Sequence, residues 1–340
     1  MRDGTRGVIR RFALACTLIL ILSGCGGSGS QPQTDDFFSM DTFMRFQVYG
    51  SKSALDGARA VVEDLASRAS ATDPDSEVYR LNRDGEAELS GETAALLSRA
   101  IELCRLTEGA VDISIYPAVR AWGFPTDEYR IPSFDETDQL SDLVDYTKVR
   151  LDGLSASLPR DMSIDLGAIA KGYAGREAAA NLRNHGVQSA LLDMGGNIQT
   201  VGAKPDGSPW RVAVQDPSSE GYAGILEIRD LAAVTSGGYQ RYFTGEDGRI
   251  YWHILDPETC RPARAGLLSV TIVAEDGSLC DALSTALFVM GPDRAEKFWR
   301  RHGGFGMVLV TEEGEVLSTP DLAFEPMEGT SYQYRVLDQR

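Results

Sequence analysis

The sequence gathers a carboxylate, a lysine and two glycines within ten residues. Segment 165–174 reads Asp-Leu-Gly-Ala-Ile-Ala-Lys-Gly-Tyr-Ala, with Asp165 and Lys171 as its charged residues. Its pattern predicts the junction between a strand and an amphipathic helix over 167–184. The start of a helix exposes unpaired backbone N–H groups and the positive end of the helix dipole, so it favours anionic ligands. The segment therefore predicts a site for a phosphate-bearing ligand.

A second polar pair, Asp281 and Thr285, lies in a segment predicted to be helical over 278–290. Residues four apart share one face of a helix. A carboxylate and a hydroxyl oxygen side by side suit Mg²⁺, a hard cation that prefers oxygen ligands. The same residues also fit an ordinary helix, in which Asp281 occupies the favourable first turn and Thr285 packs. Taken alone, the pair leaves both readings open.

Three histidines occur in the chain, and one of them has a distinctive setting. His185 and His302 each precede a glycine at a predicted helix end, where a cation is favoured. His253 instead lies in a predicted strand over 249–255 and leads into a turn that begins at Asp256. A histidine there suits a general base, with Asp256 as a second choice; a structural histidine is the alternative.

Glycine pairs mark two further turns. Gly195-Gly196 follows a predicted strand over 188–193, and Gly237-Gly238 follows another over 231–235. Paired glycines let a ligand approach the backbone closely, although a plain tight turn fits equally well. The sequence contains no Walker A motif and no GxGxxG motif. A nucleotide would therefore have to bind without those loops.

The N-terminus predicts export and a lipid anchor. Residues 1–24 combine a basic start with an apolar stretch that is too short to span a membrane, so they resemble a signal peptide. The stretch ends at Leu-Ser-Gly-Cys25, which resembles a bacterial lipobox with Cys25 as the lipidated residue. An ordinary secretory signal is the alternative. Residues 25–36 are expected to form a flexible tether, followed by a domain over 37–340.

Charge and cysteine content exclude several classes of protein. The full chain carries −17, and without residues 1–24 it has 29 basic and 49 acidic residues, a balance of −20. This acidity argues against nucleic-acid binding and against wide contact with anionic lipid. The cysteines beyond the anchor are Cys104, Cys260 and Cys280, without CxxC spacing. They predict neither a structural disulfide nor a zinc site.

The order of the predicted elements indicates the fold class. Further helices are predicted at 53–69, 92–107 and 293–302. Further strands are predicted at 44–49, 210–215, 224–229, 268–274, 305–310 and 332–337, and residues 117–163 are expected to be mostly loops with short elements. Early helices, a run of strands and late helices predict an α+β fold with a mainly antiparallel sheet, packed helices and one large domain.

Taken in order, these features resemble the ApbE family of FAD:protein FMN transferases. They span about residues 40–290. The matching features are Met40-Asp41-Thr42, Asp75-Ser76 with Asn82, Ala110-Val111-Asp112, Asp165 to Ala174, Gly195-Gly196-Asn197, Ser236-Gly237 with Tyr242, His253 to Thr259, and Asp281 to Thr285. The resemblance implies a T-fold-related catalytic domain.

The resemblance also implies a site. The residues expected to line the FAD site are Met40, Thr72, Ala110, Val111, Asp112, Asp165, Lys171 and Ile254. Mg²⁺ would be held by Asp281, Thr285 and the backbone carbonyl of Ala168. Lys171 would stabilise charge, and His253 or Asp256 would act as the base.

The implied reaction transfers FMN from FAD to a Thr or Ser hydroxyl of an acceptor protein as a phosphoester and releases AMP. The expected acceptor is a redox subunit at the extracytoplasmic face of a membrane in the cell envelope. The alternatives are an FAD pyrophosphatase that releases FMN and AMP, and a lipoprotein that only binds flavin.

Three residues depart from the family pattern. Asp41 and Cys260 stand where the family usually has glycine. Thr72 occupies a position that carries an aromatic residue against the flavin in some members. The last departure is expected to loosen flavin retention and so to shift the balance between transfer and hydrolysis.

Overall fold

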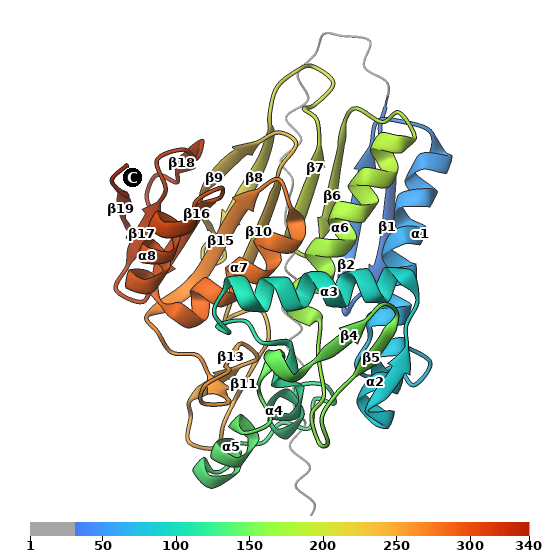
Figure 1. Ribbon diagram of the computed structural model, residues 1–340. Coiled ribbons are helices and arrows are strands. Elements are labelled where there is room, and N and C mark those ends of the chain that lie inside the picture. Colours follow the sequence, from blue (N-terminus) through green and yellow to red (C-terminus); the bar gives the residue numbers. More distant parts are fainter. Residues whose placement is uncertain (1–30, 340) are drawn as a thin grey trace, which may run out of the picture.

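The computed structural model describes residues 31–339 and is built around a sheet of nine strands (Figure 1). In order across the sheet these are β1 (Gln33–Ser39), β2 (Thr42–Val48), β6 (Ala190–Met194), β7 (Asn197–Val201), β10 (Ala232–Gly237), β15 (Leu267–Ala274), β16 (Gly306–Thr311), β17 (Glu315–Ser318) and β19 (Gln333–Val336). Neighbouring strands are antiparallel except β17 and β19, which are parallel. The predicted α+β class with a mainly antiparallel sheet is confirmed.

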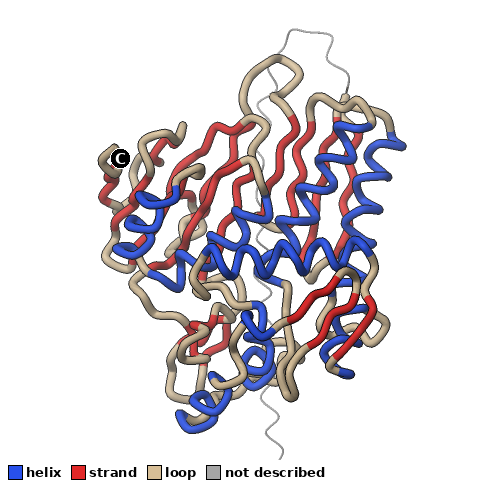
Figure 2. The backbone as a smooth tube through the Cα atoms, viewed as in Figure 1, coloured by secondary structure: helices blue, strands red, loops and turns tan. Residues whose placement is uncertain are grey.

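Helices cover one face of this sheet, as Figure 2 shows. They are α1 (Lys52–Ala69), α6 (Gly167–Asn184), α7 (Gly277–Met290) and α8 (Pro292–His302), while α3 (Gly91–Leu106) runs across the lower ends of α1 and α6 in Figure 1. Helix α6 packs against both α1 and α7. Small residues on α6 allow this close packing, since Ala174, Ala178 and Ala179 are fully buried.

A smaller sheet covers part of the opposite face. Its strands, in order, are β18 (Phe324–Pro326), β9 (Tyr222–Ile228) and β8 (Trp210–Gln215). Apolar side chains of β8 and β9, such as Val214 and Leu226, form one buried cluster with Ile198 and Val308 of the large sheet. The large sheet is therefore covered on both faces along part of its width.

Short elements form a second layer below α3 in Figure 1. They are α2 (Glu77–Asp84), α4 (Tyr116–Ala121), α5 (Phe134–Ser141), β3 (Glu86–Glu88), β4 (Arg150–Asp152), β5 (Ser155–Ser157), β11 (Tyr242–Thr244), β12 (Ile250–Trp252), β13 (Leu255–Asp256) and β14 (Arg261–Pro262), with single 3₁₀ turns at Ile113–Ile115 and Tyr146–Lys148. Aromatic packing holds this layer together: the Phe243 ring stacks on Tyr129 at 4.8 Å and on Tyr251 at 5.4 Å.

Local sequence signals account for the long helices. Ser51 and Ser90 accept backbone N–H bonds at the starts of α1 and α3, and Asp276 does so at the start of α7. The predicted helices therefore lie within one or two residues of the observed ones. Helix α2 and strands β7 and β17 were not predicted, because each is short and is stabilised mainly by its neighbours.

Strand β1 corrects the predicted tether. It begins at Gln33 and pairs residue by residue with β2, so residues 33–36 of the predicted tether (25–36) belong to the sheet. Phe37 is buried opposite Met44 within this pairing, which fixes the register of the strand. The signal peptide (1–24) and Cys25 lie outside the described residues.

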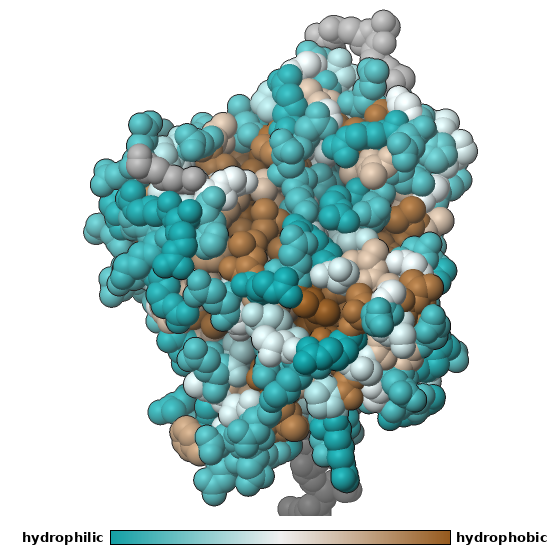
Figure 3. Space-filling model, viewed as in Figure 1, coloured by the Kyte–Doolittle hydropathy of each residue, from teal (hydrophilic) through white to brown (hydrophobic). Residues whose placement is uncertain are grey.

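The helix-covered surface is mainly hydrophilic, with apolar side chains visible in scattered patches (Figure 3). Within residues 31–339, no helix has the length and apolar character that a membrane crossing needs. Cys104, Cys260 and Cys280 are buried free thiols. Burial raises the pKa of Cys260 to about 12, so this thiol stays protonated at neutral pH.

Candidate active site

Asp165 stands directly before helix α6 and is held there by long-range bonds. Its N–H donates to the carbonyl oxygen of Ile113 (2.8 Å), and its Oδ1 accepts the N–H of Gly167 (2.8 Å). The preceding residue, Ile164, is fixed on both sides of its backbone by the carboxamide of Asn82, at 2.7 and 2.8 Å. This arrangement explains why Asn82 belongs to the motif: it positions the segment that leads into Asp165.

Lys171 lies at the centre of the charged residues. Its side chain leans back along the first turn of α6, with Nζ 3.5 Å from the carbonyl oxygen of Gly167. Burial raises the pKa of Asp165 and of Asp281, and the positive charge of Lys171 opposes both shifts. The same charge contributes to the lowered pKa of His253. The fold therefore brings these four predicted residues within electrostatic reach of one another.

Helices α6 and α7 meet at Gly172. The N–H of Gly172, whose regular helical acceptor is the carbonyl oxygen of Ala168, donates to Oδ2 of Asp281 (2.8 Å). The carboxylate of Asp281 is buried, and the Ala168 carbonyl lies at the same turn of α6. Within residues 31–339, the bond from Gly172 is the hydrogen bond seen on the Asp281 carboxylate. Two of the three predicted metal-ligand groups therefore come together.

Thr285 follows Asp281 by one turn of α7 and faces the end of strand β10. Its Oγ1 is 3.2 Å from Oγ of Ser236, which is also 2.8 Å from Oγ of Ser284. Ser284 in turn donates to the carbonyl oxygen of Asp281 (2.8 Å). This chain of hydroxyl groups fixes the Thr285 side chain on the face that Asp281 occupies.

The oxygen atoms of Asp281, Thr285 and Ala168 suit a hard cation. Only one of them is a carboxylate. In the described part of the chain, no three His, Cys, Asp or Glu side chains gather to hold a metal. The predicted site would therefore be of a different kind, with one carboxylate, one hydroxyl and one backbone carbonyl as its ligands.

His253 does not lie within a strand, which corrects the predicted strand over 249–255. It sits at a bend between β12 and β13, just beyond the last residue pair of β11 and β12, and its backbone N–H donates to the carbonyl oxygen of Arg241 opposite it (3.1 Å). Its Nδ1 lies 3.1 Å from the same carbonyl oxygen. Since a carbonyl only accepts hydrogen bonds, Nδ1 carries the proton and Nε2 keeps a free lone pair.

Burial lowers the pKa of His253 to about 4, with the charges of Arg241 and Lys171 acting in the same direction. The imidazole is therefore neutral at physiological pH, the form that accepts a proton. Its ring also meets the edge of Phe124 at 6.4 Å between ring centres. The neighbourhood thus holds a neutral histidine in one tautomer and one orientation.

Arg241 was not singled out from the sequence. Its guanidinium donates to the carbonyl oxygen of Phe124 and lies 3.5 Å from Oδ1 of Asp127. Its charge opposes the raised pKa of Asp165. One residue thus orients His253 through its backbone and adds positive charge through its side chain. No sequence pattern signals this, because the contact depends on the pairing of β11 with β12.

Met40 lies in the tight turn between β1 and β2. Met40 and Asp41 both have positive φ, 48° and 58°. The adjacent turn between β6 and β7 comes so close that a Cβ on Gly195 would lie 2.0 Å from Oγ1 of Thr42. The negative charge of Asp41 adds to the raised pKa of Asp165. The structure therefore places this turn beside the start of α6.

Segment 110–112 approaches the site through its backbone. The Asp112 carboxylate is buried and accepts bonds from the N–H of Ser114 (2.8 Å), its hydroxyl (2.6 Å) and the N–H of Tyr146 (2.9 Å). Ala110 and Val111 are buried in the core. The side chain of Asp112 therefore organises this loop, and the neighbouring carbonyl of Ile113 reaches Asp165.

Thr72 is exposed in the loop after α1, where its hydroxyl lies 3.2 Å from that of Ser70. Tyr116, which the sequence did not single out, connects this loop to the site. Its hydroxyl donates to the carbonyl oxygen of Ala71 (3.1 Å). Burial raises the pKa of Tyr116, and the nearby charge of Asp165 raises it further.

Ile254 and Asp256 differ in setting from His253. The Ile254 side chain is buried in the core beside α7, and its carbonyl accepts the N–H of Ala263 (2.9 Å). Oδ1 of Asp256 accepts the N–H of Glu258 (2.9 Å) and so holds the turn. Burial raises the pKa of Asp256, and the charges that act on it are Glu258 and Arg294. The structure does not bring Asp256 together with the residues around Lys171.

The two glycine departures fall at left-handed backbone positions. Asp41 has φ 58° and Cys260 has φ 54°. Glycine adopts this region without steric cost, whereas other residues are strained there by about 1–2 kcal/mol, and Asp tolerates it better than most. Both turns form despite the departures: the N–H of Cys260 still donates to the carbonyl oxygen of Asp256 (2.8 Å).

Comparison with known proteins places this geometry in a family. The sequence profile of the ApbE family matches residues 40–309. An FAD:protein FMN transferase of Vibrio cholerae is 31% identical over 300 residues, which cover 84% of this chain and 89% of that protein. An FAD:protein FMN transferase of Treponema pallidum is 30% identical over 354 residues and covers 95% of both chains.

Solved structures agree. The ApbE protein of Thermotoga maritima superposes with a TM-score of 0.78 at 31% identity, over 88% of this chain and 97% of that one. The flavin transferase ApbE of Vibrio cholerae superposes with a TM-score of 0.74 at 27% identity, over 89% and 98%. The similarity therefore extends over the whole described domain and is not limited to the motifs.

Proposed function

The chain belongs to the ApbE family, and we propose that its site transfers FMN from FAD to a Thr or Ser hydroxyl of an acceptor protein, with Mg²⁺ bound and AMP released. The relatives that match this chain over most of their length are FAD:protein FMN transferases. The protein is thus an enzyme that moves flavin from FAD to a protein. The metal, the hydroxyl acceptor and the AMP product are our proposal.

One observation carries the proposal. The Gly172 N–H brings the buried Asp281 carboxylate to the turn of α6 that holds the Ala168 carbonyl, within reach of the Lys171 charge. These oxygens, with the Thr285 hydroxyl, match the preference of Mg²⁺ for oxygen ligands. When bound, the ion would neutralise phosphoryl oxygens and stabilise the leaving group.

His253 supplies the base. Its neutral imidazole, with the proton on Nδ1 held by the Arg241 carbonyl, offers Nε2 to the acceptor hydroxyl. As Nε2 takes the proton, the hydroxyl oxygen forms a bond to the phosphorus of the FMN half. The bond from that phosphorus to the bridging oxygen breaks, and AMP leaves with that oxygen. Lys171 and Arg241 place positive charge where negative charge develops.

The flavin end of FAD is expected at the turns around Met40, Thr72 and segment 110–112. Each turn has a neighbour that acts on Asp165: Asp41 and Tyr116 interact with its charge, and Ile113 accepts its backbone N–H. Much of this lining is backbone: the side chains of Val111 and Ile254 point into the core. The exposed Thr72 offers no ring for flavin stacking. It is the feature that favours hydrolysis of FAD as a competing outcome.

We further propose that the domain is anchored through a lipid on Cys25 at the extracytoplasmic face of a membrane, within the cell envelope. Strand β1 begins at Gln33. The eight residue steps from Cys25 to Gln33 can span at most about 29 Å. The acceptor would then be a redox subunit at the same membrane. The acidic balance of −20 gives no support to a nucleic-acid partner.

A flavinylation assay tests the proposal. The purified protein is incubated with FAD, Mg²⁺ and an acceptor that carries an exposed Thr, and the products are separated on a denaturing gel. Flavin fluorescence on the acceptor together with free AMP supports transfer. Free FMN and AMP without labelling indicate a pyrophosphatase. Tight FAD binding with neither product indicates a flavin-binding lipoprotein and contradicts the proposal.

A further inference from the structure

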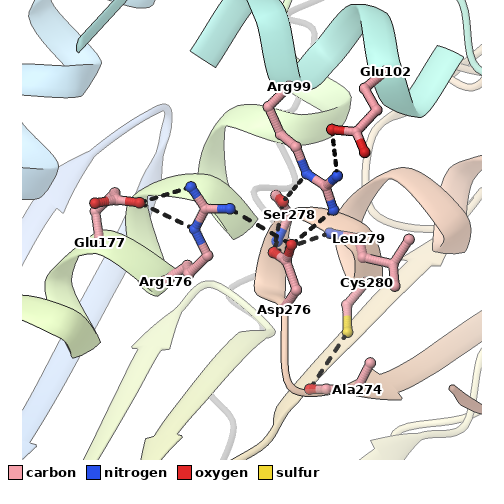
Figure 4. Close-up of polar contacts among 9 residues, drawn as sticks. All are labelled: Arg99, Glu102, Arg176, Glu177, Ala274, Asp276, Ser278, Leu279 and Cys280. Carbon is pink, nitrogen blue, oxygen red and sulfur yellow. Dashed lines mark hydrogen bonds and ion pairs between the residues drawn. The ribbon is translucent and has the colours of Figure 1, made fainter. Parts of the chain in front are cut away.

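Two arginines from different helices converge on one carboxylate just before α7 (Figure 4). Asp276 pairs through Oδ2 with Arg99 of α3 at 2.7 Å and with Arg176 of α6 at 3.5 Å. Its Oδ1 accepts the N–H of Ser278 (2.8 Å), the hydroxyl of Ser278 (2.6 Å) and the N–H of Leu279 (3.4 Å). Asp276 therefore joins three helices at one point.

The surroundings hold this arrangement in place. Arg99 also donates through Nε to the Ser278 hydroxyl (3.1 Å) and pairs with Glu102 at 2.7 Å. Arg176 pairs with Glu177 at 2.7 Å and lies over the Tyr173 ring, with Cζ 4.4 Å from its centre. The guanidinium groups are thus fixed by second partners, so each presents a defined edge to Asp276.

Asp276 stays charged in this position. Burial alone would raise its pKa, but the Ser278 hydroxyl and the charges of Arg99 and Arg176 hold the pKa below its ordinary value. The Arg99 and Asp276 side chains are only 20% and 28% exposed. An ion pair shielded to this extent is screened less than one at the open surface.

The network lies next to the helix crossing that forms the site. Gly277 follows Asp276, and a Cβ on Gly277 would lie 2.6 Å from the carbonyl oxygen of Gly172. Arg176 follows Gly172 by one turn of α6, and Asp281 follows Gly277 by about one turn of α7. A shift of α7 relative to α6 would therefore change the separation between the Asp281 carboxylate and the Ala168 carbonyl directly.

We infer that Asp276, through Arg99 and Arg176, is a positioning residue that sets α7 against α6 and so holds Asp281 and Thr285 beside the Ala168 carbonyl for metal binding. The inference rests on the proposed Mg²⁺ site. A role in stability alone would affect unfolding and leave metal affinity unchanged, so metal affinity is the quantity that separates the two.

The test measures cation binding in the absence of FAD. Mn²⁺ serves as the probe, because electron paramagnetic resonance counts the free ion, and Mg²⁺ is then titrated in competition. Asp276→Asn keeps a good helix cap but removes the charge. Arg99→Gln removes one of the two cations and leaves every cap bond of Asp276 in place. Arg99→Lys restores the charge without the two-pronged geometry.

Asp230→Asn is the matched control. Asp230 also joins a backbone N–H and an arginine: its Oδ1 accepts the N–H of Gly202 (2.6 Å) and Nη2 of Arg183 (3.0 Å). Its pKa is likewise held below its ordinary value, against the effect of burial, by that N–H and by Arg183. The same substitution there alters stability at the far end of α6 without touching α7.

We expect the Mn²⁺ dissociation constant to rise about tenfold in Asp276→Asn and less in Arg99→Gln, as for other residues that orient metal ligands. Arg99→Lys should bind more tightly than Arg99→Gln, and Asp230→Asn should match the wild type. Unchanged affinity in both Asp276→Asn and Arg99→Gln would overturn this inference and leave the proposed function standing. Failure of the wild type to bind Mn²⁺ or Mg²⁺ would instead overturn the metal site of the proposed function. If Asp276→Asn does not fold, Arg99→Gln decides.

Discussion

The N–H of Gly172 lies 2.8 Å from Oδ2 of Asp281, although the two residues are 109 positions apart in the chain. The contact exists because the backbones of α6 and α7 touch: a Cβ on Gly172 would lie 2.1 Å from the carbonyl oxygen of Gly277. Any side chain at residue 172 would therefore force one of the two helices to move. The predicted phosphate site at the start of α6 and the predicted metal pair on α7 are thus two halves of one arrangement.

Replacing Gly172 with Ala should separate the two halves. The added methyl group meets backbone atoms of Gly277, which yield only if α7 shifts. We expect a loss of about 1–3 kcal/mol in the free energy of unfolding, measured by urea titration. Because Asp281 moves with α7, Mg²⁺-dependent FAD turnover should fall about a hundredfold.

Gly175→Ala on the same helix is the control for this substitution. A Cβ there would meet the flexible end of the Met194 side chain, at 2.3 Å, which moves aside easily. We expect less than about 1 kcal/mol of change and near-normal turnover. Equal effects at both positions would contradict the proposed role of the helix crossing.

Asp281→Asn tests the metal assignment. The substitution keeps the shape of the side chain and removes the charge that a divalent cation needs. FAD turnover measured over a range of Mg²⁺ concentrations should fall about a hundredfold or more, and Asp281→Ala should abolish it. Full activity in either variant would refute the assignment.

The difference in stability between Asp281→Asn and the wild type should depend on pH in a defined direction. Burial raises the pKa of Asp281 in the folded protein, so the folded state holds the proton more tightly than the unfolded state. Stability is therefore lost as pH rises through the range between the two pKa values. With EDTA present, the variant should gain stability relative to the wild type as pH rises from 4 to 8. Urea unfolding at several pH values measures this, and the opposite trend would mean that the charged carboxylate is stabilised without metal.

Local signals in the sequence predicted the frame of the site, and tertiary contacts supplied the rest. The apolar periodicity of α6 and α7 located Asp165, Lys171, Asp281 and Thr285 near helix starts and on helix faces. The direct contact between the two helices could not be read, because it depends on glycine packing between segments a hundred residues apart. The role of Arg241 could not be predicted either, because its carbonyl oxygen reaches His253 only when β11 pairs with β12.

His253 should act as a base down to unusually low pH. Since burial lowers its pKa to about 4, kcat/KM for FAD should stay level down to about pH 5 and fall below it as the imidazole takes up a proton. His253→Gln should lower the rate about a hundredfold or more. His302→Gln, at the end of α8 where the ring stacks on Phe298 at 4.3 Å, should leave the profile unchanged. If kcat/KM of the wild type instead fell with a midpoint near pH 6.5, the base would be a more exposed group.

Asp41→Gly should strengthen FAD binding. The Asp41 charge adds to the raised pKa of Asp165 and lies beside the start of α6, where the negative diphosphate is expected. Its φ of 58° suits glycine, so the backbone turn remains intact. Removing one exposed charge should tighten FAD about two- to fivefold, measured by fluorescence quenching, and the gain should shrink at high salt. Asp161→Gly is the control: this exposed Asp also has a left-handed backbone, with φ 65°, and no charge contact with Asp165 is evident. The same gain in both variants would point to net charge and not to this turn.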